Sequence, residues 1–157
     1  MPADAVLNDL ISIMFYETGM TSQNVNKVIR WKQRFSNFEK SFLQLEKAIQ
    51  IKNPNETERA GLMQFFEITF ELSWKTLKDF LEAEGLTTQS PREAIKQAFQ
   101  SQLIANGGEW IEALEDRNLT VHTYDETTAR QIETLIRQKY FAMLQQFYCD
   151  FQQKRNA

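Results

Sequence analysis

The sequence predicts an all-α fold: an antiparallel up-and-down bundle of five main helices, preceded by an N-terminal helical extension. The chain of 157 residues has only five glycines and three prolines, and all but Gly61 fall where a helical pattern breaks. Between these breaks, apolar residues recur at spacings of three and four, which is the period of a helix with one buried face. The connections are short, so consecutive helices should be antiparallel neighbours.

The chain divides into three parts on this interpretation. Residues 1–29 form the extension, in which a helix over 4–18 ends at Gly19. Residues 30–151 form the bundle, and residues 152–157 form a tail that we expect to fray.

The second helix has the clearest periodicity in the chain. Its apolar positions follow one another at spacings of three and four without interruption, at a mean period of 3.5, which is typical of long helices packed at shallow angles. The Asn53-Pro54-Asn55 stretch ends this helix. The positions are Val28, Trp31, Phe35, Phe38, Phe42, Leu45 and Ile49.

A third helix is predicted over residues 56–84, ending at Gly85, and its wide apolar face places it between neighbours. Glu71 and Lys75 lie on its polar side in the favourable order for an ion pair one turn apart. Such a strip is usually a solvated face, although its charges could also contact a partner. The main apolar stripe is Met63, Phe66, Phe70, Trp74, Leu77 and Leu81.

Two further helix starts are marked by capping boxes. Ser90 with Glu93 predicts a fourth helix from Pro91 to about Ile104, which the Asn106-Gly107-Gly108 stretch ends. Thr123 with Glu126 predicts a break near His122 and a last helix to about Phe151. The fifth helix lies between them, with Trp110, Ile111, Leu114 and Val121 as its apolar stripe.

Composition excludes several classes of protein. The net charge of −3 argues against a general nucleic-acid binder, because such affinity comes mostly from Lys and Arg at phosphates. No signal peptide or membrane-spanning run is evident, so we expect a cytoplasmic protein without a membrane partner. A lone cysteine, Cys149, excludes an intrachain disulfide.

Neither a metal nor a cofactor is expected. The one histidine and the one cysteine are separated in a way that matches no zinc spacing. The chain also lacks the glycine patterns of nucleotide-binding loops, which argues against its being a transferase itself.

Four of the polar residues within the eight positions 117–124 form the candidate site: Arg117, Asn118, His122 and Tyr124. In one continuous helix Arg117 and His122 would diverge, but the predicted break lets His122 turn back toward Arg117. A lone histidine near an arginine is more often a structural residue, paired between helices, than a catalyst. The spacing alone therefore leaves both interpretations open.

The Arg117-Asn118-x-x-x-His122-x-Tyr124 stretch is similar to the arginine–histidine motif of HEPN domains, in which four to six residues separate the two. Three further stretches, residues 30–35, 66–81 and 90–94, resemble the nucleotidyltransferase substrate-binding protein branch of that family. The resemblance covers residues 30–151.

This resemblance implies a homodimeric bundle that works with a separate minimal nucleotidyltransferase, commonly as the toxin of a toxin–antitoxin pair, and many members are metal-independent ribonucleases. It implies that Arg117 holds the scissile phosphate, His122 moves a proton and Asn118 orients either of them. Tyr124 corresponds to the residue that the partner modifies with AMP. The alternative is a noncatalytic subunit that binds a substrate or nucleotide for the nucleotidyltransferase.

RNA cleavage through a cyclic phosphate profits from a base and an acid, yet each chain has one histidine. Two chains meeting at His122 would supply both, which favours a site at a dimer interface. The six acidic residues within 109–126 would repel RNA unless basic residues converge there. We expect Lys75, Lys78 and Glu71 to contact the substrate or the partner. Either Lys75 and Lys78 or the basic stretch 27–34 would supply the positive charge that RNA requires.

Overall fold

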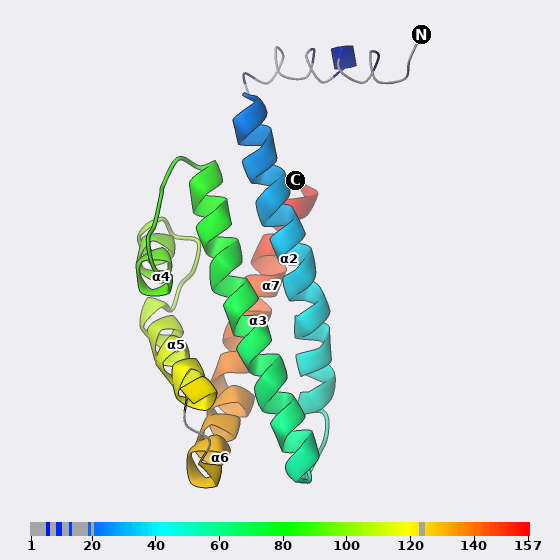
Figure 1. Cartoon of the computed structure of the whole chain (residues 1–157), viewed down its shortest axis with the longest axis vertical. Helices are drawn as coiled ribbons and strands as arrows, with labels where there is room; N and C mark the ends of the chain where they lie inside the picture. The colour runs from blue at the N-terminus through cyan, green and yellow to red at the C-terminus, as the bar shows by residue number, and fades with distance from the viewer. Residues whose placement is uncertain (1–5, 7–8, 11–12, 14–18, 20, 123–124) are drawn as a thin grey trace.

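The computed structural model describes residues 6, 9, 10, 13, 19, 21–122 and 125–157, and these form the predicted all-α bundle without a strand (Figure 1). Most of the helix predicted over 4–18 lies outside the described residues. The elements are α2 (Ser22–Ile49), α3 (Glu56–Ala83), α4 (Pro91–Gln100), α5 (Gly107–His122), α6 (Glu126–Leu135), the π-helical turn η1 (Ile136–Tyr140) and α7 (Phe141–Asn156).

An aromatic seam between α2 and α7 forms one half of the core. The rings of Phe38 and Phe147 meet edge to face with centroids 4.8 Å apart, and those of Trp31 and Phe151 meet likewise at 5.9 Å. Edge-to-face contacts of this kind add to the stability that burial of the rings provides. The predicted stripe is confirmed, since Trp31, Phe35, Phe38, Phe42 and Leu45 are all buried.

Helix α3 lies between α2 on one side and α4 and α5 on the other (Figure 1). Its wide apolar face is confirmed, because Phe66 and Phe70 are fully buried and Trp74 is half-buried. Small hydroxyl residues face α2, where the Ser41 and Thr69 hydroxyls lie 2.6 Å apart. Such small side chains let α2 and α3 approach closely while each buried hydroxyl keeps a hydrogen-bond partner.

Both ends of α3 follow standard capping chemistry. The Asn55 side chain accepts from the Glu58 amide at 2.8 Å, and the Glu58 carboxylate accepts from the Asn55 amide at 3.0 Å. At the other end Gly85 has φ +88°, and the Leu86 amide donates to the Leu81 carbonyl at 2.8 Å. The predicted stop at Gly85 is therefore confirmed.

Helix α4 is shorter than predicted, because it ends at Gln100 and not near Ile104. Gln102 adopts the left-handed conformation, with φ +61°, and the Leu103 amide donates to the Ala98 carbonyl at 2.9 Å. Gly107 begins α5 instead of ending α4. A Cβ atom at Gly107 would lie 2.9 Å from Cγ of Phe99, so glycine is required where the two helices meet.

Two predicted boundaries differ from the structure. Helix α2 begins at Ser22, capped by Thr21, and passes through positions 29 and 30 without a break. Helix α7 continues to Asn156, where fraying was expected after residue 151. Arg155 holds this end in place, because its guanidinium lies 3.0 Å from the Glu39 carboxylate and 4.8 Å from the centroid of the Phe35 ring.

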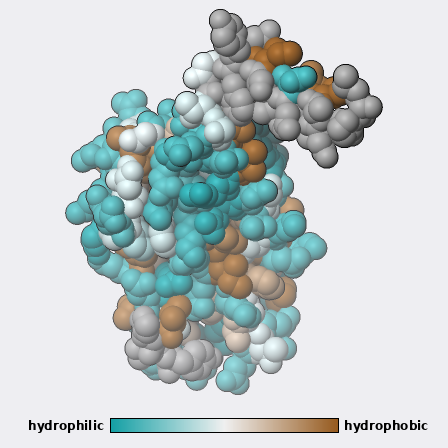
Figure 2. Space-filling model, turned by 45° about the horizontal axis from the view of Figure 1, so that its top comes forward, coloured by the Kyte–Doolittle hydropathy of each residue, from teal (hydrophilic) through white to brown (hydrophobic). Residues whose placement is uncertain are grey.

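On the face that Figure 2 shows, most of the coloured surface is hydrophilic, and the hydrophobic residues lie in small separate patches. Among the described residues, no helix combines the length and the hydrophobicity that crossing a membrane would require.

Replacing Phe38 by Ala should lower the free energy of unfolding by about 3–5 kcal/mol, because it empties a fully buried position. Leu43→Ala, on the same helix but 43% exposed, is the matched control and should cost less than about 1 kcal/mol. Urea unfolding followed by circular dichroism measures both. Similar losses at the two positions would contradict the described packing of α2.

Candidate functional site

The orientation of α5 is set by its first two turns. Trp110 is 2% exposed, and its ring centroid lies 5.8 Å from that of Phe70 on α3 and 5.6 Å from that of Phe147 on α7. Ala113 and Leu114 continue the buried side of the helix. With this side fixed, the following turn of α5 carries Arg117 against α3.

Arg117 spans the gap between α5 and α3. One terminal nitrogen of its guanidinium lies 2.9 Å from the Glu71 carboxylate, and the other donates to the Asn118 side-chain oxygen at 3.3 Å. The side chain is 23% exposed, and its buried Nε has no hydrogen-bond partner in the described structure. A buried donor without a partner is costly, so a water or a group outside the described residues would be needed to satisfy this N–H.

The Glu71 carboxylate contacts two cations and one further hydrogen-bond donor in this region. It accepts from the Trp74 indole at 3.1 Å and lies 3.0 Å from the Lys75 ammonium, which confirms the predicted pair one turn apart. Burial raises the pKa of Glu71, but hydrogen bonds from Lys75 and Trp74 and the charges of Arg117 and Lys75 outweigh it, so the pKa lies below its ordinary value. Two cations therefore share one ionised carboxylate.

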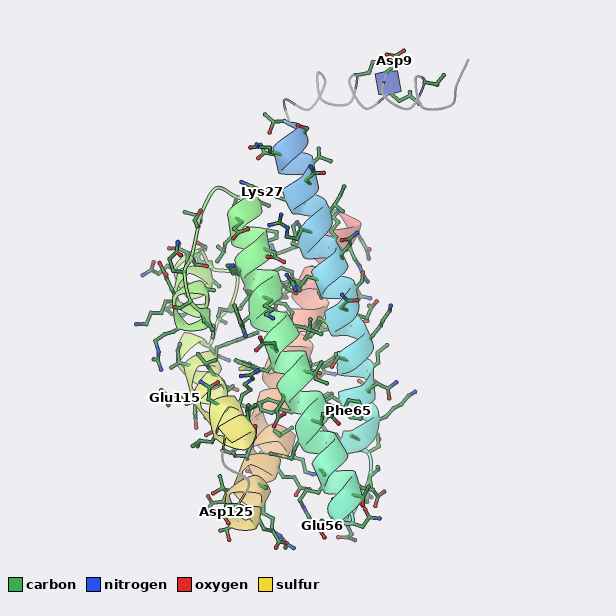
Figure 3. The ribbon with its side chains drawn as sticks, in the orientation of Figure 1. Asp9, Lys27, Glu56, Phe65, Glu115 and Asp125 are labelled. Atoms are coloured by element: carbon green, nitrogen blue, oxygen red, sulfur yellow. The ribbon has the colours of Figure 1, made fainter. Side chains whose placement is uncertain are left out.

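The other basic residues lie elsewhere along α3. Lys78 is 3.8 Å from Glu82, and Arg34 of α2 is 3.0 Å from Asp79. Asp79 is eight residues beyond Glu71, which is about 12 Å along a helix axis. Figure 3 places Lys27 near the end of the bundle opposite to Asp125. The basic stretch 27–34 therefore does not converge on Arg117, whereas Lys75 does.

Two of the acidic residues of α5 pair with cations on neighbouring elements, and a third accepts a hydrogen bond from a neutral phenol. Glu115 lies 3.0 Å from Arg92 of α4, and Glu112 pairs with Lys139. The Asp116 carboxylate accepts a hydrogen bond from the Tyr140 hydroxyl. Each contact also ties α5 to a neighbouring helix.

The Asp116–Tyr140 contact was not predicted, although Tyr140 fits the apolar stripe of the last helix, four residues after Ile136. Tyr140 is fully buried in the η1 turn, where the Phe141 amide donates to the Ile136 carbonyl. Burial and the hydrogen bond to Asp116 raise the pKa of this phenol. π-Helical turns are frequent at functional sites, and this one holds the residue before Arg117 in position.

Helix α5 runs through His122, so the predicted break near this residue follows it and does not precede it. Arg117 and His122 therefore belong to one continuous helix, in which positions five residues apart diverge, and no break between them turns His122 back toward Arg117. The next helix, α6, begins at Glu126 and is capped by Asp125, whose side chain accepts from the amides of Thr127 and Thr128. The Thr123 end of the predicted capping box lies outside the described residues. The His122 side chain, Thr123 and Tyr124 lie outside the described structure. Arg117 and Asn118 are thus placed. His122 ends the same helix five residues after Arg117, about 7.5 Å further along its axis.

Comparison with known proteins gives one family match over most of the chain. The model of the family described as "nucleotidyltransferase substrate binding protein like" matches residues 33–153. A probable ribonuclease HepT of Haemophilus influenzae is 30% identical over 82 residues, which are 49% of this chain and 56% of that protein. This chain therefore spans little more than half the length of the curated relative it matches.

Two solved structures are similar to this one. A protein of Thermus thermophilus has 34% identity and a TM-score of 0.59, covering 74% of this chain and 93% of its own. A tri-AMPylated HEPN toxin of Shewanella oneidensis, in complex with an MNT antitoxin, has 15% identity and a TM-score of 0.64, covering 85% of this chain and 98% of its own. At that identity the second likeness concerns the fold, which is the HEPN all-α fold.

Replacing Glu71 by Gln should lower the free energy of unfolding by roughly 1 kcal/mol at neutral pH, because the neutral amide loses its attraction for Arg117 and Lys75. The pKa of Glu71 is lowered from 4.5 in the folded protein, so its contribution is present above 4.5 and is lost as the pH falls through the folded pKa. The difference in the free energy of unfolding between wild type and variant should therefore disappear as the pH falls through that acidic range.

Urea unfolding at a series of pH values measures this difference. Glu46→Gln is the control, since Glu46 has no ion-pair partner among the described residues. A difference for Glu71→Gln that is independent of pH would contradict the assignment of an ionised carboxylate.

Proposed function

This chain belongs to the nucleotidyltransferase substrate-binding-protein-like family, and from that premise we propose that it is a metal-independent ribonuclease that works with a separate minimal nucleotidyltransferase as the toxin of a toxin–antitoxin pair. The probable ribonuclease at 30% identity supports the activity. The HEPN toxin bound to its antitoxin supports the pairing, as a protein of the same fold.

The observation that carries the proposal is the state of Arg117. Its guanidinium is mostly covered and is oriented by Glu71 and Asn118, and its Nε has no partner among the residues that the structure describes, in the helix that ends at the only histidine of the sequence. An arginine is suited to this role because its planar fork grips two phosphoryl oxygens and its charge is permanent.

In the proposed reaction the ribose 2′-oxygen attacks the adjacent phosphorus while His122 accepts its proton. A bond from phosphorus to the 2′-oxygen forms, the bond to the 5′-oxygen breaks, and the leaving oxygen receives a proton. The products are a 2′,3′-cyclic phosphate and a free 5′-hydroxyl. Arg117 stabilises the charge that develops on the phosphoryl oxygens, with Lys75 supplying a second positive charge beside it.

The chain should act as a homodimer. One histidine per chain cannot be a base and an acid in the same step, so we place the His122 of two chains at one composite site. A two-fold axis next to the end of α5 would bring the two residues together.

Tyr124 is the proposed acceptor of the AMP group that the nucleotidyltransferase transfers. It lies two residues after His122, so an added AMP would bring a phosphate and a nucleotide to the same turn. Occupation of the site by that group would compete with RNA, which accounts for restraint of the toxin. Lys78, beyond Lys75 on the exposed strip of α3, is assigned to binding of substrate or partner.

The second candidate is a noncatalytic subunit that presents a substrate or nucleotide to the nucleotidyltransferase. The description of the matching family favours it. The same residues would then bind phosphate without cleaving RNA, so measurement of RNA cleavage distinguishes the two functions.

Replacing His122 by Ala should reduce RNA cleavage by about 10²–10⁴-fold, because a proton acceptor is lost. Arg117→Lys should reduce cleavage by about 10²–10³-fold, because an ammonium lacks the planar fork. Arg92→Lys, which alters a comparable interhelix pair with Glu115, is the control and should cleave like wild type. Gel analysis of a labelled RNA, in the presence of a chelator, measures all three.

A His122→Ala protein that cleaves as well as wild type would place the activity elsewhere. Absence of cleavage by wild type, with binding of nucleotide retained, would favour the second candidate.

Refolding wild-type and His122→Ala chains together produces mixed dimers, and the activity of the mixture tests the composite site. If both histidines of a dimer act at one site, activity falls as the square of the wild-type fraction, to about one quarter in an equal mixture. A linear fall to about one half would show that each chain cleaves alone, and a monomer by light scattering would contradict the dimer directly.

A further inference from the structure

A small pocket lies between α3, α5 and α6, one turn from the Arg117–Glu71 contact. It has a volume of about 140 Å³, and its walls include Ala60, Met63, Gln64 and Glu67 of α3 with Thr120 of α5 and Ala129 of α6. Figure 3 shows that Glu56, at the start of α3, and Asp125, before α6, lie at the same end of the bundle.

The pocket is connected to the candidate site through two helices. Glu67 precedes Glu71 by one turn of α3, about 5.4 Å. On α5, the Thr120 hydroxyl donates to the Arg117 carbonyl at 2.8 Å. A phosphate at Arg117 and a group in the pocket would therefore be neighbours within one nucleotide.

Two polar side chains at the pocket, the exposed Gln64 and the half-buried Glu67, are open to solvent and so accessible to a ligand. Neither Gln64 nor Glu67 has a hydrogen-bond or ion-pair partner in the part of the chain that the structure describes. Their neighbours on α3 differ in this respect, since Glu71 has three partners and Glu58 caps the helix. The pocket thus combines an apolar floor at Met63 and Ala129 with two polar groups at its side.

We propose that this pocket binds a nucleobase that carries an exocyclic amino group, next to the phosphate held by Arg117. The inference rests on the proposed function in taking RNA as the natural source of that base. Proteins that recognise RNA sequence commonly bind an unstacked base in this way, through its hydrogen-bonding edge.

Size and chemistry both limit what can bind. Pockets for drug-sized ligands measure roughly 300–1,000 Å³, so this one admits a ring system and not a whole nucleotide. The thioether of Met63 is a favourable contact for an aromatic ring. A carboxylate at Glu67 disfavours phosphate, which leaves the base for the pocket and the phosphate for Arg117.

Glu67 also distinguishes among the bases. A carboxylate only accepts hydrogen bonds, so it pairs with the amino group of adenine, cytosine or guanine. The Gln64 amide donates to the ring nitrogen or carbonyl beside that amino group and accepts where a second donor is present. Uracil has its one edge donor between two carbonyl oxygens, which the carboxylate would repel.

The test has a cleavage arm and a binding arm, both with the full chain. In the first, a pool of random single-stranded RNA is cleaved and the cut positions are sequenced. Wild type should show enrichment of amino-bearing bases over uracil at one fixed position beside the cut. Glu67→Gln should reduce that enrichment roughly tenfold.

A second pocket variant and a control complete the cleavage arm. Ala60→Phe, which fills the pocket from an exposed position, should abolish the enrichment. Glu46→Gln, on α2 outside the pocket, should leave it unchanged. Circular dichroism checks that each variant folds.

In the binding arm, His122→Ala protein is titrated with AMP, CMP and UMP by calorimetry. AMP and CMP should bind more tightly than UMP, and adding Glu67→Gln or Ala60→Phe should remove the difference. An unchanged base preference in Glu67→Gln overturns the pocket even if cleavage is normal. If wild type does not cleave RNA, the proposed function fails, and the binding arm alone decides whether the pocket takes the base of a free nucleotide or none.

Discussion

The position of α5 against α3 is the constraint on which the candidate site depends. The Phe70–Trp110 contact fixes the first turns of α5 against α3. The ion pair between Arg117 and Glu71, the next residue of α3 after Phe70, holds the last turns of α5. The aromatic seam between α2 and α7 supports this arrangement from behind, because it buries the opposite side of α3. Glu71, on a rigid helix, holds the guanidinium in one orientation, as a pre-organised binding site requires.

Helix α3 joins the core to the site, because adjacent residues of one helix belong to each. Phe66 and Phe70 are fully buried, while Glu67 and Glu71, directly after them, face α5 and the pocket. Packing of the rings therefore sets where the carboxylates lie. Lys139 and Arg92 offset the charges of Glu112 and Glu115, whereas the Tyr140 hydroxyl is neutral and positions Asp116 without offsetting its charge.

Local chemistry made much of the fold predictable from sequence. The seven apolar positions of α2, the Asn55 cap and the glycine stop at Gly85 each follow from residue type and spacing. The end of α4 was mispredicted because Gln102, a residue with no preference for positive φ, takes the left-handed position that glycine usually fills. The partner of Arg117 was not predicted, since Glu71 lies 46 residues away and only the packing of α3 on α5 joins them.

Arg117 is proposed to bind a phosphate, and the most direct measurement of that binding is the ¹⁵N NMR signal of its side-chain Nε–H. This group is buried and has no partner in the described structure, so its proton should exchange slowly, and Arg117→Lys assigns the signal by its loss. Addition of a 2′-deoxy analogue of a cleaved RNA, which binds without reacting, should shift that signal while the Nε–H signal of Arg92 stays in place. Saturating binding of the analogue with the Arg117 signal unchanged would contradict the account.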